Sequence, residues 1–474
     1  TYISKTFASY NRSSNKPYIV ITYTVNQNVQ FDNYGERMYI NEASQINAQL
    51  YHTFSSNVSY IFIAINVDEL TVSNPSITQF GYCTVTGKKL GVFSVNCCLK
   101  TQDYIIDTFS IPLHITLRND GYFIRNCESE RHLSALNNTF SEGNTLCQWS
   151  FNPAYQIWNI SYVKISDSTG YYTIAVNNYG IPYYIGLNGS GELILTSNSI
   201  LNNIKWKIRN VPNDYGYIIS PYTDTTKSLA VCIDGSGGSN GAGIEITTYV
   251  NDTILLDEWI ICSRKSVSMV DGHDDYPITT EYGVMKNSFA DIGITNTFDS
   301  LSYNAYDILY NEAIDRIRYS KAIFINAHGS QTSVYMHNTM ITNSVIGSIY
   351  NDDNNAFGMC DLVVYVSCLT AKGGPGANNL CQATLDAGVD TVIGFREVVP
   401  ADGCRFWMKK FTEYLCTCFG NQTETYNSIV SMAMNDTADE NPDWMDFYDE
   451  GKHVVMDSCQ GFGNDNLPGV NSWN

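Results

Sequence analysis

Two apolar segments in the C-terminal half of the chain each end in a side chain that can take part in nucleophilic chemistry. Residues 321–328 read Lys-Ala-Ile-Phe-Ile-Asn-Ala-His, and residues 361–368 read Asp-Leu-Val-Val-Tyr-Val-Ser-Cys. An imidazole beside a thiol can take the thiol proton and later deliver it to a leaving amine. If the two segments are neighbouring strands, His328 and Cys368 emerge at the same sheet edge. The sequence therefore predicts a His-Cys catalytic dyad.

Gly329 follows the histidine directly. Its bare backbone can approach a substrate, and its N–H, with that of Cys368, can point at a developing oxyanion. We therefore expect Gly329 and Cys368 to supply the oxyanion donors.

A cysteine at a strand end is also commonly a packing residue or half of a disulfide. Six other cysteines follow residue 264, and these could pair with one another and leave Cys368 free.

The elements that must position the dyad are strands alternating with amphipathic helices after about residue 264. This alternation predicts an α/β domain with a mainly parallel sheet and helices on both faces. In such sheets the chemistry lies at the carboxyl ends of the strands. We expect strands over 266–270, 289–295, 321–327, 361–367 and 390–395, and helices over 303–319, 377–387, 403–419 and 423–435.

With these motifs, residues 264–474 resemble the caspase, gingipain, clostripain and separase superfamily of cysteine peptidases. Its signature is an apolar strand followed by His-Gly, and a second apolar strand followed by Ala-Cys or Ser-Cys. Residues 373–383 are similar to the loop and helix after the nucleophile, and 388–395 to the next core strand. The resemblance implies that Cys368 is the nucleophile and His328 the general base and acid.

The resemblance leaves the substrate preference open. In the superfamily, the loop after the first strand and the segment after the fifth shape the pocket for the residue before the scissile bond. The first loop here contributes Asp271, Asp274 and Asp275, which would favour Arg or Lys. The second segment contributes Arg396, which would favour Asp or Glu. We expect these four residues to form the substrate pocket.

Metal binding has little support in the sequence. Cys416 and Cys418 have no second pair at zinc-ligand spacing. The run 351–355 offers oxygen ligands for calcium, although such runs are typical of solvated turns. We expect no metal and no other cofactor.

Residues 120–263 repeat themselves three times, which predicts three similar units packed around one core. Each unit opens with glycine and an aromatic residue and closes on a tryptophan, from Gly121 to Trp158, Gly170 to Trp206 and Gly216 to Trp259. This pattern resembles the ricin-type β-trefoil. The resemblance implies that the three tryptophans share the core.

The trefoil resemblance bears on sugar binding and on disulfides. The family's early aspartate is absent from the corresponding segments 133–135, 184–186 and 229–231, and Asp234 is the one acid that could substitute. We therefore expect an appended domain that binds a carbohydrate or cell-surface ligand or acts as a spacer.

The resemblance also implies disulfides, one between Cys127 and Cys147 and a second between Cys232 and Cys262.

Residues 1–119 contain short alternating runs, at 18–25, 60–67 and 108–117, which predict a β-sandwich. Cys83 is expected to pair with one of the two adjacent cysteines at 97 and 98. The chain as a whole is therefore expected to be multidomain: an all-β sandwich over 1–119, a β-trefoil over 120–263 and a caspase-like α/β domain over 264–474.

Composition limits the function classes. A net charge of -20 gives no electrostatic footprint for nucleic acid or an anionic membrane. No apolar run approaches the roughly 18 residues of a membrane span. Fourteen cysteines and a first residue that is Thr1 favour a processed, secreted chain.

We expect a secreted cysteine endopeptidase with a peptide or protein substrate. The alternative is a non-catalytic extracellular adhesion or assembly protein on a degenerate peptidase scaffold.

Overall fold

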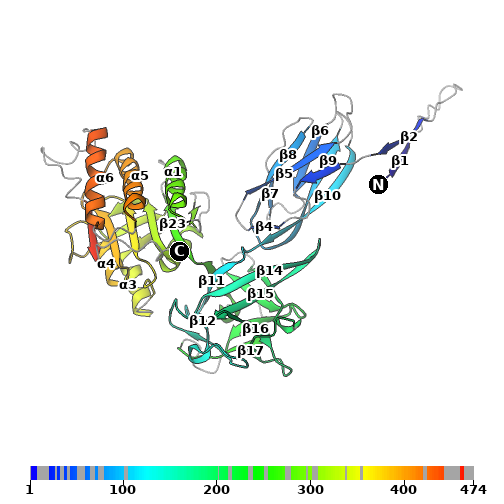
Figure 1. Ribbon diagram of the computed structural model, residues 1–474, viewed down its shortest axis with the longest axis horizontal. Coiled ribbons are helices and arrows are strands. Elements are labelled where there is room, and N and C mark those ends of the chain that lie inside the picture. The colour runs from blue at the N-terminus through cyan, green and yellow to red at the C-terminus, as the bar shows by residue number, and fades with distance from the viewer. Residues whose placement is uncertain are drawn as a thin grey trace. The chain divides into compact units, whose positions relative to one another are not determined.

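The computed structural model, whose strands and helices Figure 1 shows, divides by its internal contacts into two compact units. The first contains Thr1–Asn119, Ile160–Ile174 and Ile200–Ser228, and the second contains the remainder. The structure describes residues 2–7, 21–26, 29–32, 37–39, 43–50, 59–64, 70–72, 80–100, 105–200, 202–211, 216–232, 239–249, 255–272, 279–294, 297–301, 308–336, 339–352, 356–419, 424–441 and 459–463.

The described residues before 119 form strands alone, which confirms the all-β prediction for this part. They make two four-stranded sheets, of order β4-β10-β9-β6 and β3-β5-β8-β7, and a separate pair, β1-β2. The strands are β1 (Tyr2–Phe7), β2 (Ile21–Asn26), β3 (Val29–Asp32), β4 (Arg37–Tyr39), β5 (Ala43–Leu50), β6 (Ser59–Ala64), β7 (Leu70–Val72), β8 (Phe80–Gly87), β9 (Gly91–Lys100) and β10 (Ile105–Thr116).

The next part of the chain, up to residue 263, consists of strands and short 3-10 turns, η1 (Leu136–Asn138), η2 (Asn202–Ile204) and η3 (Leu255–Asp257). Within the second unit, β11 pairs with β12 and β22, and β12 with β13. The strands are β11 (Asp120–Asn126), β12 (His132–Ala135), β13 (Leu146–Trp149), β14 (Trp158–Ser166), β15 (Thr169–Asn178), β16 (Ile181–Leu187), β17 (Leu193–Thr196), β18 (Trp206–Asn210), β19 (Tyr217–Pro221), β20 (Lys227–Val231), β21 (Ile244–Thr248) and β22 (Trp259–Ser263).

The tryptophans that close the repeats are fully buried. The indole N–H of Trp158 donates to the Leu133 carbonyl at 2.9 Å, and that of Trp259 donates to the Leu229 carbonyl at 2.8 Å. Leu133 and Leu229 open the two segments that the repeat pattern places in equivalent positions. The same hydrogen bond therefore recurs in the first and third repeats.

The C-terminal part contains a six-stranded sheet of order β24-β23-β25-β29-β30-β31. The first five strands are parallel and β31 is antiparallel to β30. The mainly parallel sheet is therefore confirmed. Its strands are β23 (Lys265–Asp271), β24 (Thr297–Leu301), β25 (Ser320–Asn326), β29 (Leu362–Val366), β30 (Thr391–Phe395) and β31 (Cys459–Gly463). Three further strands make a small antiparallel sheet, β26 (His328–Ser330), β27 (Ser333–Met336) and β28 (Thr339–Thr342).

Helices cover both faces of this sheet, as predicted. Side chains alternate along β25, so that Phe324 packs with helices α1, α5 and α6, whereas Ile323 and Ile325 pack with α2, α3 and α4. The helices are α1 (Thr279–Asp291), α2 (Ile308–Tyr319), α3 (Asn343–Asp352), α4 (Leu380–Asp386), α5 (Ala401–Cys418) and α6 (Tyr426–Glu440).

The predicted strand over 289–295 is wrong, because its first residues belong to helix α1. Ile292 and Ile294 have the two-residue spacing of a strand, but Met285 and Phe289 follow the helical spacing of four residues. Both of these side chains are fully buried against the sheet. The strand of this region is β24, which begins at Thr297.

The predicted disulfides are wrong, because twelve cysteines in the described part of the chain, including all the predicted partners other than Cys83, form no disulfide bond. Cys83 lies on β8, which pairs with β5 and β7, whereas the adjacent cysteines 97 and 98 lie on β9 in the other four-stranded sheet. Cys127 is bound through its N–H to the Glu258 carbonyl, whereas Cys147 lies opposite Gly243. The Cys232 N–H also bonds to the Gly243 carbonyl, but the Cys262 thiol lies 3.7 Å from an Asp315 carboxylate oxygen. These cysteines therefore face different neighbours.

A buried charge cluster lies in the second unit, where β11 meets helix α2. Asp315, 2% exposed, accepts from Arg125 at 2.9 Å and lies 3.5 Å from Arg318. The half-exposed Glu130 lies 3.1 Å from Arg318 and 3.8 Å from Arg125. Burial opposes the charge of Arg125, but its acidic neighbours, chiefly Asp315, raise its pKa. The two arginines and the two acidic side chains of the cluster therefore neutralise one another.

The buried His132 beside this cluster should make the folding stability of the chain sensitive to acid. Burial, followed by Arg125 and Arg318, lowers the pKa of His132 well below its ordinary value of about 6.5. The folded chain therefore holds His132 neutral, bonded to the Tyr319 hydroxyl at 2.8 Å, while the unfolded chain binds a proton. Stability due to His132 is fully present above pH ~6.5 and falls as the pH drops below it.

The measurement is the unfolding midpoint of the full-length chain between pH 7.5 and 5. The His132→Gln variant keeps a partner for Tyr319 but cannot titrate, so its midpoint should depend less on pH. Equal acid sensitivity in the two proteins would contradict the prediction.

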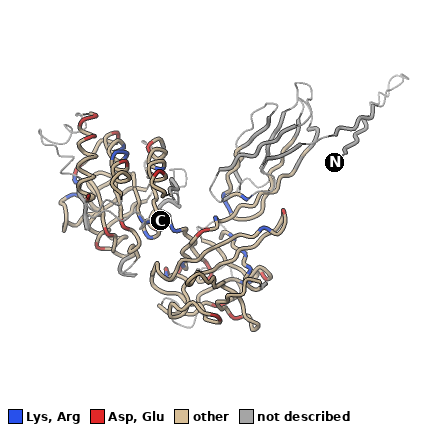
Figure 2. Tube along the Cα trace, viewed as in Figure 1, with Lys and Arg blue, Asp and Glu red and all other residues tan. Residues whose placement is uncertain are grey.

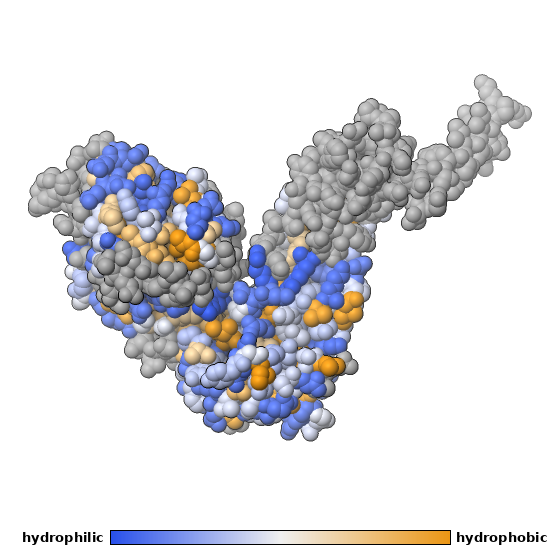
Figure 3. Space-filling view, in the orientation of Figure 1, coloured by the Kyte–Doolittle hydropathy of each residue, from blue (hydrophilic) through white to orange (hydrophobic). Residues whose placement is uncertain are grey.

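Charge and hydropathy on the surface are mixed. Figure 2 shows Lys and Arg interspersed with Asp and Glu along the helices of the C-terminal part. In Figure 3, hydrophobic residues on the visible described surface form groups separated by polar ones. Among the described helices, none has the length and apolar character needed to cross a membrane.

Candidate active site

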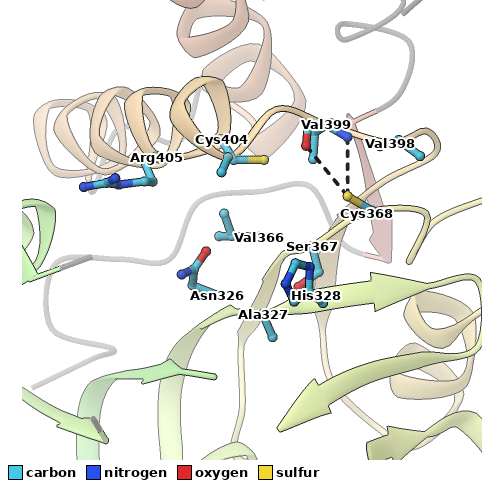
Figure 4. Close-up of a pocket in the computed structure, with 11 residues that line it drawn as sticks. Asn326, Ala327, His328, Val366, Ser367, Cys368, Val398, Val399, Cys404 and Arg405 are labelled. Atoms are coloured by element: carbon cyan, nitrogen blue, oxygen red, sulfur yellow. Dashed lines mark hydrogen bonds between the residues drawn. The ribbon is translucent and has the colours of Figure 1, made fainter. Parts of the chain in front are cut away.

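Neighbouring parallel strands bring His328 and Cys368 to one edge of the sheet. Strand β25 pairs with β29, and Asn326 and Val366 are partners at their carboxyl ends. This pairing confirms that the two segments are adjacent strands. His328 begins β26 two residues beyond Asn326, and Cys368 follows Val366 by two residues. Both side chains line one cavity of about 300 Å³ (Figure 4).

The cavity lies between these strand ends and the beginning of helix α5 (Figure 4). This is the carboxyl edge at which open α/β sheets bind ligands. His328 is exposed and Cys368 is partly buried. Besides the dyad, the cavity is lined by apolar residues, including Val366, Val398 and Val399, and by polar ones, Asn326, Ser367 and Arg405.

Gly329 allows the backbone directly after His328 to contact the backbone at Cys368. A Cβ atom added at Gly329 would lie 2.5 Å from the Cys368 carbonyl oxygen and 2.9 Å from the Ser367 Cβ. No side chain fits at such distances, so only glycine lets the backbone of β26 touch the Cys368 peptide. The structure thus adds a reason for the His-Gly motif beyond the expected approach to substrate.

The segment after β30 is bound to the segment that carries Cys368. The Ala371 N–H donates to the Phe395 carbonyl at 2.9 Å, and the Leu369 N–H donates to the Glu397 carbonyl at 3.0 Å. The Val399 N–H then donates to the Cys368 Sγ at 3.4 Å, and the thiol lies 3.7 Å from the Val399 carbonyl oxygen (Figure 4).

Leu369, the residue after the cysteine, adopts a left-handed conformation with φ of 61°. This region is costly for a residue with a branched side chain and persists where the surroundings hold it in place. Here the hydrogen bond from the Leu369 N–H to Glu397 holds it. The chain therefore turns sharply directly after Cys368.

Of the four residues expected to form the substrate pocket, the structure describes Asp271 and Arg396, and neither is among the residues that line the cavity. Asp271 ends β23 and is 7% exposed, and its carboxylate accepts from the Asn326 amide at 2.9 Å. Arg396 directly follows β30 and is not among the residues that line the cavity. Asp274 and Asp275, and the candidate sugar ligand Asp234, lie outside the described residues.

Sequence reasoning missed two polar residues of the cavity, Asn326 and Arg405. Asn326 could have been found, because it is a polar residue at the end of an otherwise apolar strand, two residues before His328. Arg405 lies on α5, where its Nη2 donates to the two carboxylate oxygens of Glu281 at 3.0 and 3.1 Å. Val398 and Val399 belong to the segment after the fifth strand, which is expected to shape the pocket, and both line the cavity.

The candidate calcium run is only partly visible, since residues 353–355 lie outside the described part of the chain. Among the residues that the structure describes, no three His, Cys, Asp or Glu side chains gather in a metal-binding arrangement.

No protein-family model and no curated protein matches the chain. Among solved structures, the Rhizoctonia solani agglutinin is 15% identical over 32% of this chain and 99% of that one, with a TM-score of 0.25. Domains 5–6 of the S-layer protein SbsC are 14% identical over 48% of this chain and 100% of that one, with a TM-score of 0.16. Similarities of this size establish no shared fold, so the site must be interpreted from its own geometry.

Proposed function

We propose that the C-terminal part of the chain is a cysteine endopeptidase that uses His328 and Cys368. One observation carries the proposal: adjacent parallel strands end at these two residues, and both line the same cavity. Cys368 is also a free thiol, as a nucleophile must be.

In the proposed reaction, the His328 imidazole takes the Cys368 proton and the sulfur attacks the scissile carbonyl carbon. The N–H groups of Gly329 and Cys368 stabilise the oxyanion, since the Leu369 N–H is already bonded to Glu397. The imidazolium then protonates the departing amine as the C–N bond breaks. Water, deprotonated by the same imidazole, cleaves the thioester and returns the free thiol.

The mainly parallel sheet with helices on both faces supports a caspase-like fold for this part. The recurring bond from a buried tryptophan to an upstream leucine carbonyl supports a ricin-like trefoil over 120–263, as an appended binding or spacer domain.

The rival function is non-catalytic adhesion or assembly on the same scaffold. The contact between Cys368 and the Val399 backbone favours it, because this contact occupies the thiol. The rival predicts a cysteine that does not react with substrate-like reagents.

A peptidyl acyloxymethyl ketone distinguishes the two functions, because it labels a cysteine only after binding as a substrate. Mass spectrometry of the full-length chain should locate the label on Cys368, and the labelling rate should fall when His328 is replaced. Cys418 is an internal control, since it is partly exposed and lies outside the cavity, and burial, with Glu424, raises its pKa. Labelling of Cys418 instead, or of no cysteine, would refute the peptidase.

A further inference from the structure

The cavity beside Cys368 has an apolar middle and a polar end. Figure 4 shows Cys368 and Val399 on one side of the lining and Asn326 and Arg405 on the other, with Val366 between them. Its volume of about 300 Å³ is at the small end of ligand sites, and fits one side chain. A substrate with its carbonyl at Cys368 would place the preceding side chain toward the polar end.

Asn326 presents a hydrogen-bond acceptor to the cavity. Its amide NH₂ donates to Asp271 at 2.9 Å. A carboxylate only accepts hydrogen bonds, so the NH₂ group must face Asp271 and the amide oxygen must face away. Figure 4 shows this oxygen directed upward from the strand end toward α5. It forms no hydrogen bond with the described residues.

Arg405 and Ser367 present further polar groups that lack partners. The Arg405 Nε and the Ser367 Oγ are buried and have no hydrogen-bond partner among the described residues, and Ser367 is 2% exposed. The Arg405 Nη2 is bonded to Glu281, and its Nη1 lies 3.7 Å from the exposed Asp402, so acidic neighbours neutralise the guanidinium. The polar end therefore offers a donor from Arg405 and an acceptor from Asn326, without an uncompensated positive charge, while Ser367 lies beside His328 (Figure 4).

We propose that this cavity selects a carboxamide side chain, Asn or Gln, as the residue before the scissile bond. Its NH₂ would donate to the Asn326 oxygen and its carbonyl would accept from Arg405. Asp or Glu has no N–H for Asn326 and adds a negative charge near Glu281. Arg or Lys adds a positive charge beside Arg405, and an aliphatic side chain leaves the buried polar atoms without partners.

The proposal deepens the proposed function, but binding can be measured without turnover. Full-length Cys368→Ala is titrated with peptides that differ only at the residue before the scissile bond, namely Asn, Gln, Asp, Glu, Arg or Leu. The Asn or Gln peptide should bind at least tenfold more tightly than every other peptide. Equal or tighter binding of an acidic, basic or aliphatic peptide, or no binding of any peptide, would overturn the proposal.

Hydrolysis by the unmodified protein is measured in parallel with the same peptides. Selective binding of the amide peptide without any cleavage would refute the peptidase and leave the pocket assignment intact. Preferred cleavage of a charged peptide would refute the pocket assignment and leave the peptidase intact.

A charge swap tests the same assignment within the Cys368→Ala protein. Glu281→Gln removes the charged partner of the Arg405 Nη2 and leaves only the exposed Asp402 at 3.7 Å, so the ratio of Asn to Asp affinity, or of Gln to Glu, should fall at least tenfold. Glu413→Gln is the matched control, because Glu413 also pairs with lysines on α5 but lies outside the cavity lining. An unchanged ratio in Glu281→Gln would overturn the role of Arg405.

Discussion

Replacing Cys368 by alanine should abolish peptide hydrolysis by the full-length chain, and replacing His328 by alanine should cost a comparable factor. Without the thiol no acyl-enzyme forms, and without the imidazole the thiol proton has no acceptor and the departing amine no donor. Because nucleophile and base act as a unit, either change should lower kcat by about 10⁴-fold or more. The measurement is turnover of the best peptide found in the substrate panel.

The control for this experiment is Cys418→Ser, which alters another free, partly exposed thiol outside the cavity. Its turnover should equal that of the unmodified chain. All three variants should keep nearly the same unfolding midpoint, since neither His328 nor Cys368 is fully buried. Substantial turnover in either dyad variant would remove the assignment of the dyad.

Replacing Asp315 by alanine should destabilise the second unit by about 3–5 kcal/mol, since it leaves a buried arginine without its main counter-charge. Asp315 is 2% exposed and lies 2.9 Å from Arg125, which is itself 5% exposed. Water cannot replace the lost carboxylate at that depth. Chemical unfolding of the full-length chain, followed by tryptophan fluorescence, measures the loss because Trp158 and Trp259 are buried in the same unit.

Glu130→Ala is the matched control for Asp315, because Glu130 pairs with the same two arginines. Its side chain is 47% exposed, so water screens these pairs and the loss should be about 1 kcal/mol or less. A loss for Asp315→Ala no larger than that for Glu130→Ala would show that burial does not strengthen the cluster.

The positions of the dyad could be predicted because apolar runs set both strands. A run such as Ala322 to Ile325 is buried on both faces, which only a central strand covered by two helical layers provides. A polar residue directly after such a run must then lie at the sheet edge. The same reasoning failed at Phe289, whose spacing fits both a strand and a helix, and only packing of α1 on the sheet decides between them.

The rest of the site depends on contacts between residues distant in the chain. Arg405 reaches the cavity because α5 begins just beyond the end of β30, and its Nη2 is bonded to Glu281, 124 residues earlier. The number and spacing of cysteines likewise do not reveal which strands are neighbours. The cysteines whose spacing suggested disulfides have different neighbours in the structure. A single sequence contains no signal for either kind of contact.

The hydrogen bond from the Val399 N–H to the Cys368 sulfur makes this amide a reporter for the state of the thiol. The two bonds next to it, from Leu369 and Ala371, end on carbonyl oxygens and do not involve the sulfur. Acylation, alkylation or oxidation of Cys368 therefore changes the partner of Val399 while its neighbours keep theirs. In a ¹⁵N-labelled chain, the Val399 resonance would shift on modification, against the fixed reference of the other two amides.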